Sequence, residues 1–213
     1  MKIIDVEQGS REWAMARLGI PTASEFHRIV TPVKGDLSSQ ARRYAHQLVA
    51  ETLMGEPLES MLGNLEWIAR GKLMEPHAVQ MYEFTTDLAT RPVGFMTTDD
   101  GRIGASPDRL VLEMPGAVEI KCTAPQTHVG FLIDGVGDDY RPQVQGQLLV
   151  SELDWVDFYA YHPTLPPVQI RTHRDEPYIS RLRSALDRFL EMRDTMLDEA
   201  RETGFFDRPR RVA

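Results

Sequence analysis

The sequence predicts an α/β fold in which helices flank a central mixed β-sheet. Hydrophobic residues recur at helical spacing near both ends of the chain, and short strand-like segments separated by turn residues lie between residues 91 and 121. Two more strand-like segments precede the last helix. With 213 residues and no Gly/Ser-rich linker, residues 1–213 are expected to form a single domain.

Three helices are expected in the first part of the chain, over residues 22–30, 40–54 and 65–84. The first begins with Thr22 followed three residues later by Glu25, which is the spacing of a capping box. The second ends before Gly55, a residue type suited to a C-terminal cap. Apolar residues at helical spacing support the second and third helices.

The hydrophobic period then changes from that of helices to that of strands. Strands are expected over residues 91–97, 102–105, 109–113 and 117–121, with turns at Asp100-Gly101 and Pro115-Gly116. A helix over residues 139–152 tolerates Pro142 because proline is accepted in a first helical turn. The remaining elements are strands over 155–161 and 168–172 and an amphipathic helix over 177–203.

The composition excludes several classes of protein. A single cysteine, Cys122, permits neither an intrachain disulfide nor the four-cysteine iron–sulfur centre of some helicase-linked nucleases. No apolar run approaches the roughly 18 residues that span a bilayer, and the first residues do not form a signal peptide. We therefore expect a cytoplasmic protein with no membrane partner.

Two carboxylates and a lysine are the candidate catalytic residues. Asp108 stands at the head of one predicted strand, and Glu119 lies eleven residues later in the next. Glu119 and Lys121 project to the same side because residues i and i+2 of a strand share a face. A hairpin between the two strands would bring Asp108 close to both.

This combination suits the hydrolysis of a phosphodiester. Carboxylate oxygens bind Mg²⁺, which lowers the pKa of water and neutralises phosphate charge, and a nearby lysine can orient the nucleophile. From spacing alone, such residues are more often a solvated sheet face or a surface salt bridge. The alternation of Glu119 and Lys121 with apolar neighbours and a charged cluster at residues 67–75, on the preceding helix, favour the catalytic interpretation.

Blocks of sequence along most of the chain resemble, in the same order, the phage λ exonuclease family of PD-(D/E)xK nucleases. The blocks are residues 7–13, 17–19, 22–25, 71–75, 106–108, 119–122 and 140–145. The resemblance implies a restriction-endonuclease-like core. It also implies a Mg²⁺-dependent 5′-to-3′ exonuclease, in which Mn²⁺ substitutes, that degrades linear double-stranded DNA from 5′-phosphorylated ends. The 3′ overhangs that remain would serve phage-type recombination in a bacterial host.

By the same resemblance, Asp108, Glu119 and the backbone carbonyl of Ile120 are metal ligands, and Lys121 positions the nucleophile. Glu75 is implied as a third acidic participant at the metal. Gln143 is implied to contact the metal site or the substrate, although a merely polar helix face is the alternative for this residue and for Gln145 and Gln147.

The resemblance also implies a pocket for the terminal 5′-phosphate. Arg17 and Ser24 are its expected ligands, Trp13 its wall, and Tyr140 part of the wall at the metal site. Otherwise Ser24 would be a helix cap, Arg17 a surface cation and Trp13 a core residue. Arg109 departs from the family pattern, in which glycine often follows the aspartate, and it is expected to add positive charge at the metal.

The net charge of −8 is unusual for a protein that binds DNA. Residues 1–80 are nearly neutral, with nine Lys/Arg against ten Asp/Glu, whereas residues 81–213 carry fifteen against twenty-two. Family members form a ring-shaped homotrimer around DNA, and such enclosure would hold the substrate without a basic surface. A single-strand annealing protein is the partner that the resemblance implies.

Two other functions compete with this one. A PD-(D/E)xK endonuclease or junction resolvase would share the core but cleave closed circular DNA. A non-catalytic DNA-end-binding module would need no intact carboxylates, and Asp108, Glu119 and Lys121 argue against it.

Overall fold

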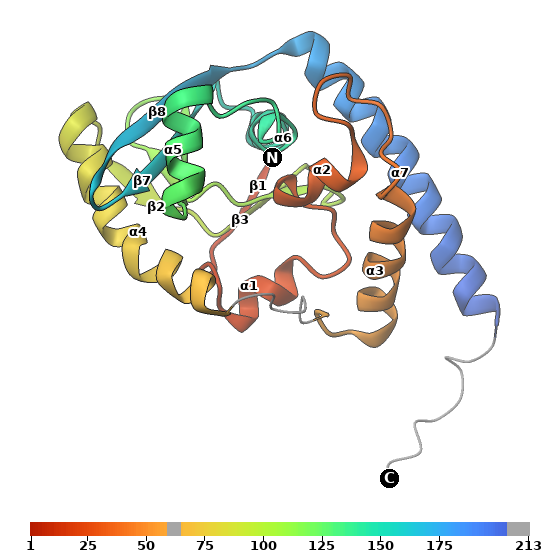
Figure 1. The fold of residues 1–213 in the computed structure, drawn as a ribbon. Coiled ribbons are helices and arrows are strands. Elements are labelled where there is room, and N and C mark those ends of the chain that lie inside the picture. The colour runs from red at the N-terminus through yellow and green to blue at the C-terminus, as the bar shows by residue number, and fades with distance from the viewer. Residues whose placement is uncertain (59–64, 204–213) are drawn as a thin grey trace.

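The computed structural model describes residues 1–58 and 65–203, and for residues 65–72 it describes the backbone alone. The helices are α1 (Arg11–Ala16), α2 (Phe26–Ile29), α3 (Ala41–Met54), α4 (Leu65–Thr86), α5 (Pro125–Asp134), α6 (Arg141–Ser151) and α7 (Glu176–Glu202). The strands are β1 (Lys2–Ile4), β2 (Thr90–Pro92), β3 (Phe95–Thr97), β4 (Gly104–Ala105), β5 (Arg109–Val111), β6 (Gly116–Cys122), β7 (Trp155–His162) and β8 (Leu165–His173). Their arrangement is drawn in Figure 1.

The central sheet is mixed and has the strand order β2-β5-β6-β7-β8. β6 and β7 are parallel, because α5 and α6 connect them as a crossover, and all other neighbours are antiparallel. The predicted α/β fold with a mixed sheet flanked by helices is therefore confirmed.

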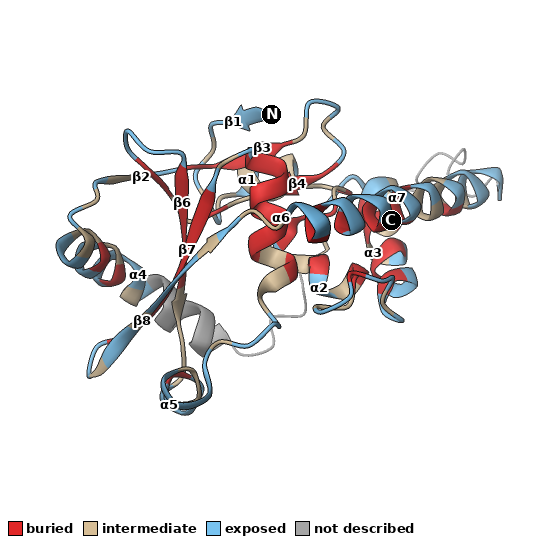
Figure 2. Cartoon of the chain, turned by 90° about the horizontal axis from the view of Figure 1, so that it is seen from above, coloured by how far each residue is buried: buried red, intermediate tan, exposed pale blue. Residues whose placement is uncertain are grey.

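Helices cover both faces of this sheet, as Figure 2 shows. α4 covers one face, where Ala78 and Tyr82 pack against Val118, Ile120 and Tyr159. α6 covers the other, and the α3–α7 pair lies beyond α6 as a further helical layer around the larger hydrophobic core. Because helices cover both faces, nearly all residues of β6 and β7 are buried, including the charged side chains of Glu119 and Asp157.

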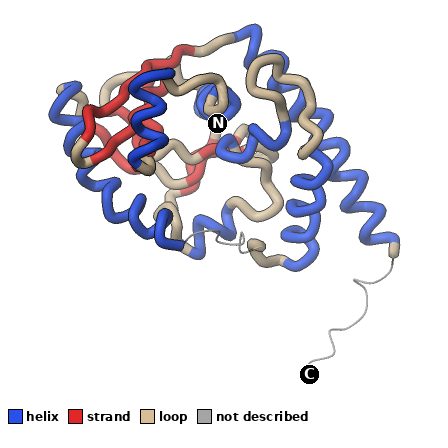
Figure 3. Tube along the Cα trace, in the orientation of Figure 1, coloured by secondary structure: helices blue, strands red, loops and turns tan. Residues whose placement is uncertain are grey.

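A smaller sheet, β1-β3-β4, lies beside the first. The strand expected over residues 91–97 is wrong as a single element, because β2 joins the central sheet and β3 joins the small one. Figure 3 shows the strands of the chain in red, between helices in blue and loops in tan. Gly94 stands at the break. A Cβ there would lie 2.4 Å from the carbonyl oxygen of Val6 and 2.5 Å from that of Ile4, so only glycine lets the N-terminal segment pass.

The helix expected over residues 22–30 is also different. It consists of a 3₁₀ turn at Ala23–Glu25 followed by the single turn of α2. The predicted capping box is wrong, because the Thr22 side chain makes no cap bond and its hydroxyl instead accepts a hydrogen bond from the guanidinium of Arg17 at 3.0 Å.

Other elements either agree with the prediction or were not expected from the sequence. α1, α5 and β1 were not expected, whereas Pro142 does lie in the first turn of α6 and α4 contains the predicted third helix. Of the charged cluster at 67–75, the side chains of residues 67–72 lie outside the described residues. Within residues 1–58 and 65–203, no helix has both the length and the apolar character to cross a membrane.

Candidate active site

The β5–β6 hairpin brings the two predicted carboxylates together. β5 and β6 pair with Arg109 opposite Val118, so Asp108, just before β5, lies beside the middle of β6. The Asp108 Oδ2 atom accepts a hydrogen bond from the backbone N–H of Ile120 at 2.6 Å. The predicted proximity of Asp108 to the Glu119–Lys121 segment is confirmed, because the antiparallel pairing of β5 with β6 places Asp108 beside β6.

Glu119 is the most enclosed charged group of the site, with 4% of its surface exposed. Its carboxylate accepts hydrogen bonds from Lys121 Nζ at 2.7 Å, from Gln143 Nε2 at 2.6 Å and from Gln147 Nε2. A buried carboxylate with three such donors is held in one orientation. The predicted face-sharing of Glu119 and Lys121 is confirmed by their ion pair.

Gln147 is a site residue that sequence reasoning did not favour. Gln143 and Gln147 are four residues apart on α6, so both side chains lie on the face toward β6. That spacing was the available signal. Gln145 points elsewhere, donating to the His173 carbonyl and accepting from the Asp175 N–H, so it joins α6 to the end of β8.

The two acidic groups make the site electrostatically unfavourable by themselves. Burial and the neighbouring carboxylate of Glu119 raise the pKa of Asp108 well above its usual range, although the Ile120 N–H and the Lys121 ammonium oppose this. For Lys121, burial alone would lower the pKa, but Glu119 and Asp108 raise it overall. The lysine is therefore a cation at neutral pH.

Tyr140 borders the same site from the start of α6. The centroid of its ring lies 5.6 Å from Lys121 Nζ and 4.8 Å from the ring centroid of Phe158. A cation over an aromatic face is attracted by the ring quadrupole. This contact limits the positions that the Lys121 side chain can adopt.

Glu75 lies on α4, which covers the face of the sheet opposite to α6. A hydrogen bond of 2.7 Å from the Tyr82 hydroxyl to the buried Asp157 fixes α4 against β7. Glu75 is exposed, yet its charge contributes to the raised pKa of Asp108. Among the residues that the structure describes, no three His, Cys, Asp or Glu side chains form a ready metal cluster. The role of Glu75 at the metal stays a prediction.

Arg109 does not add charge at this site, contrary to expectation. Its guanidinium donates to the hydroxyl of Thr90 at 2.9 Å and to the carbonyl of Thr90 at 3.2 Å. Adjacent residues of an extended segment point to opposite faces, so Arg109 does not share the face of Asp108. Its side chain contacts Thr90, the first residue of β2, instead.

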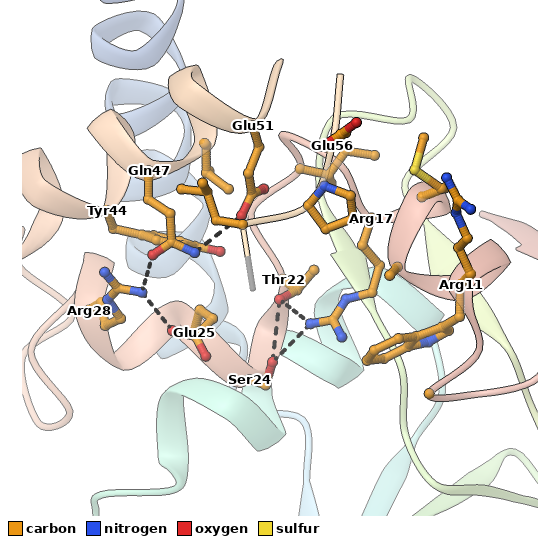
Figure 4. A pocket seen from close by; sticks show the side chains of 18 residues that line it. Arg11, Arg17, Thr22, Ser24, Glu25, Arg28, Tyr44, Gln47, Glu51 and Glu56 are labelled. Carbon is orange, nitrogen blue, oxygen red and sulfur yellow. Dashed lines mark hydrogen bonds and ion pairs between the residues drawn. The ribbon is translucent and has the colours of Figure 1, made fainter. Parts of the chain in front are cut away.

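A second feature, here called the N-terminal pocket, is a cleft of about 1000 Å³. Trp13, Arg17 and Ser24 line it together with residues of α3 (Figure 4). The Arg17 guanidinium stacks on the Trp13 ring at 3.8 Å and donates to Thr22 Oγ1 at 3.0 Å and to Ser24 Oγ at 3.5 Å. The structure thus brings the three predicted pocket residues together.

Arg17 is the cation of the pocket that contacts Thr22 and Ser24, and Arg11, Arg28, Glu25, Glu51 and Glu56 also line the cleft. Burial lowers the pKa of Arg17, but a guanidinium remains charged in proteins. The helix start that was expected to attract an anion is only a 3₁₀ turn and one turn of α2, so its dipole is small. Ser24 is exposed and can turn its hydroxyl toward a ligand.

The two sites are connected. Trp13 Nε1 donates a hydrogen bond of 3.1 Å to Ser106 Oγ, and Ser106 lies two residues before Asp108. Gln8 Nε2 also donates to the Pro107 carbonyl at 2.9 Å. The segment that carries Asp108 therefore packs directly on the wall of the N-terminal pocket, a contact that sequence reasoning missed.

The donor set of the first site suits a divalent cation. Asp108 and Glu119 present carboxylate oxygens close enough for Glu119 to raise the pKa of Asp108. Hard oxygen donors of this kind are the ligands that Mg²⁺ prefers, and a cation would offset the repulsion between them.

In the metal-free protein, Asp108→Asn should therefore increase stability. The folded protein binds the Asp108 proton more tightly than the unfolded chain, so stability falls as pH rises above the unfolded pKa of about 3.9. The variant escapes this loss, so we expect its Tm near neutral pH to be higher than that of the wild type.

Thermal unfolding in EDTA at several pH values measures this effect. The difference between variant and wild type should shrink toward pH 4. Glu119→Gln serves as the contrast, because it places an amide against the Gln143 and Gln147 donors and should destabilise by about 1–3 kcal/mol. Equal destabilisation by both substitutions would contradict the unfavourable charge at Asp108.

A family model described as the YqaJ-like viral recombinase domain matches residues 12–154. The structure is also similar to that of an alkaline exonuclease, LHK-Exo, from Laribacter hongkongensis, with a TM-score of 0.82 and 27% identity over 92% of this chain and 98% of that one. The complex of LHK-Exo with dAMP matches equally well, with a TM-score of 0.82 and 28% identity over the same shares of the two chains.

A phage-related exonuclease from Haemophilus somnus 129PT shares the fold at a TM-score of 0.68 and 17% identity, over 85% of this chain and 96% of that one. No curated protein matches the sequence. The resemblance to the λ exonuclease family and its PD-(D/E)xK core is confirmed.

Proposed function

Because the chain belongs to the YqaJ-like viral recombinase domain family, whose structural relatives include alkaline exonucleases, we propose that it is a Mg²⁺-dependent 5′-to-3′ exonuclease. Its substrate is linear double-stranded DNA with 5′-phosphorylated ends, and its products are 3′ overhangs for phage-type recombination. The observation that carries this proposal is the convergence of Asp108, Glu119 and Lys121 beside the pocket that contains Arg17.

Each group at the first site has a chemical role in this reaction. Asp108, Glu119 and the Ile120 carbonyl would hold Mg²⁺ or Mn²⁺, which when bound supplies positive charge to the phosphate and makes water more acidic. Lys121 directs its ammonium at the attacking water and at the charge that develops on phosphate. Gln143 and Gln147 keep the Glu119 carboxylate oriented, so little reorganisation is needed during the reaction.

The N-terminal pocket accounts for the preference for DNA ends. A terminal phosphate carries more negative charge than an internal diester and fits the fork of donors that Arg17 offers beside Ser24. Since Trp13 and Ser106 connect this pocket to Asp108, a phosphate bound there directs the next phosphodiester of the strand toward the carboxylates. LHK-Exo binds dAMP, and we infer that 5′-mononucleotides of this class are the products here.

The test is digestion of linear duplexes that carry a 5′-phosphate on only one strand. We expect that strand alone to be shortened from its 5′ end, with Mg²⁺ required, while closed circular DNA remains intact. Shortening from the 3′ end would contradict the polarity. Cleavage of the circle would instead favour an endonuclease or a junction resolvase, and binding to ends without cleavage a non-catalytic module.

We also propose that the protein acts as a homotrimer that encloses the DNA, which reconciles the net charge of −8 with a DNA substrate. Sedimentation equilibrium at micromolar concentration should give a mass three times the 24.2 kDa of the chain. A mass equal to that of one chain would contradict the ring.

The proposed partner is a single-strand annealing protein that binds the 3′ overhang. Co-precipitation of the two proteins with the resected duplex would test this partnership.

A further inference from the structure

The Arg17 side chain is carried by a tight turn that follows α1. The backbone N–H of Ile20 donates to the Arg17 carbonyl at 3.0 Å, and Gly19 within this turn has φ of +67°. Glycine adopts that conformation without strain. The geometry of this turn therefore determines where the guanidinium of Arg17 enters the N-terminal pocket.

Two helices that are distant in sequence hold the turn at Gly19. From α3, the carboxylate of Glu51 accepts a hydrogen bond from the Gly19 N–H at 3.3 Å. From α7, the guanidinium of Arg193 donates to the Gly19 carbonyl at 2.9 Å. Both polar groups of one residue are thus occupied by side chains from different elements of the helical layer.

The turn also lies directly on α3. A Cβ at Gly19 would stand 2.3 Å from Thr52 Oγ1, so the backbone approaches α3 as closely as glycine permits. The turn cannot shift toward α3 without a clash. It cannot shift away without breaking the bond to Glu51, which is buried.

The charge of Glu51 excludes it as a ligand for an anion. Glu51 lines the N-terminal pocket near Arg17, as Figure 4 shows, yet a carboxylate repels phosphate. Its other oxygen accepts a hydrogen bond from Gln47 Nε2 at 3.2 Å, and Gln47 Oε1 accepts one from Arg28 at 3.0 Å. The hydrogen bonds of Glu51 are made within the protein, which indicates a supporting function.

We propose that Glu51 and Arg193 are positioning residues that set the selectivity of the N-terminal pocket for a terminal phosphate. They hold the Arg17 turn from α3 and α7, so the guanidinium stays against Trp13, Thr22 and Ser24. This inference rests on the proposed function of the pocket and extends it to two residues outside the phosphate contacts. Misplacement of a binding group by about 1 Å can reduce a rate a hundredfold, so the support of the turn contributes to the selectivity that Arg17 provides.

The experiment compares 5′-phosphorylated with 5′-hydroxyl duplexes, both as digestion rates in Mg²⁺ and as affinities in EDTA. Glu51→Ala and Arg193→Met should each lower the preference for phosphate by roughly three- to thirtyfold, less than the full effect of a 1 Å misplacement. Glu51→Gln keeps one oxygen for the Gly19 N–H and should retain most of the preference. Arg188→Met is the matched control, because Arg188 is exposed on the same helix and, among the residues that the structure describes, donates to the carbonyl of Ser184 one turn earlier.

Combining these substitutions with Arg17→Ala separates the positioning role of Glu51 and Arg193 from the proposed phosphate pocket itself. If Glu51 and Arg193 act through Arg17, adding either substitution to Arg17→Ala should reduce the preference no further, since coupled residues are not additive. Loss of preference in Arg17→Ala but not in Glu51→Ala or Arg193→Met would overturn the positioning role alone. An absence of phosphate preference in the wild type would overturn the proposed pocket itself. Equal losses in Glu51→Gln and Glu51→Ala would also contradict positioning, because only the charge would then matter.

Discussion

Replacing Asp108 by Asn, Glu119 by Gln or Lys121 by Ala is expected to reduce DNA cleavage by at least roughly a thousandfold, because groups that act as one unit each account for most of its effect. The structure supplies the reason. Asp108 is bound to the β6 backbone, and Glu119 is bound to Lys121, so the three groups form one connected cluster. Steady-state digestion of a linear duplex in Mg²⁺ measures the loss.

The same cluster makes the three losses non-additive. A double variant such as Asp108→Asn with Lys121→Ala should be hardly slower than either single variant. Circular dichroism and thermal unfolding must show that each variant is folded, and Asp108→Asn is the cleanest test because it should be the most stable of them. Near-normal turnover in any folded single variant is incompatible with the proposed site.

Arg17→Ala should slow the digestion of 5′-phosphorylated ends by about ten- to a hundredfold, because a hydrogen bond to a charged group contributes roughly 1.5–3 kcal/mol. Digestion of 5′-hydroxyl ends should hardly change. The guanidinium is already oriented by Trp13 and Thr22, so the free protein needs little rearrangement before a phosphate binds.

Parallel time courses on the two substrates check this result. Arg17→Lys keeps the charge but loses both the planar stacking on Trp13 and the fork of donors, so it should recover only part of the preference. If the variant digests 5′-phosphorylated and 5′-hydroxyl ends equally more slowly, the loss comes from lower stability, and Arg17 does not bind the phosphate.

The acidic composition has a local counterpart in the N-terminal pocket. Glu25 and Glu51 line it as well, but Glu25 is paired with Arg28 at 3.0 Å and Glu51 bonds to the Gly19 N–H and to Gln47. The guanidinium donors of Arg17 face Thr22 and Ser24. Within the part of the chain that the structure describes, two of the three glutamates that line the pocket, Glu25 and Glu51 but not Glu56, are thus hydrogen-bonded to other residues, which leaves the donors of Arg17 directed toward Thr22 and Ser24.

The sequence by itself determined the fold class, the family and the pairing of the segments that carry Asp108 and Glu119. The family follows from the ordered blocks of resemblance along the chain, and the pairing from the strand alternation of residues 117–121 and the spacing of Asp108 from Glu119. The expected turn at Pro115-Gly116 is wrong in position, because the turn lies at residues 112–115 and Gly116 already begins β6, yet neighbouring strands still pair and place Asp108 next to β6.

The tertiary structure alone decided the contacts between distant segments. Whether Thr22 caps a helix or accepts from Arg17, whether Arg109 faces Glu119 or Thr90, and whether Gln147 reaches Glu119 all depend on how distant segments pack. Side chains with several donors or acceptors satisfy whichever partner the packing brings near, and local sequence does not encode that choice. The two hydrogen bonds that hold Gly19 have the same origin, because Glu51 is 32 positions and Arg193 is 174 positions away from it in the sequence.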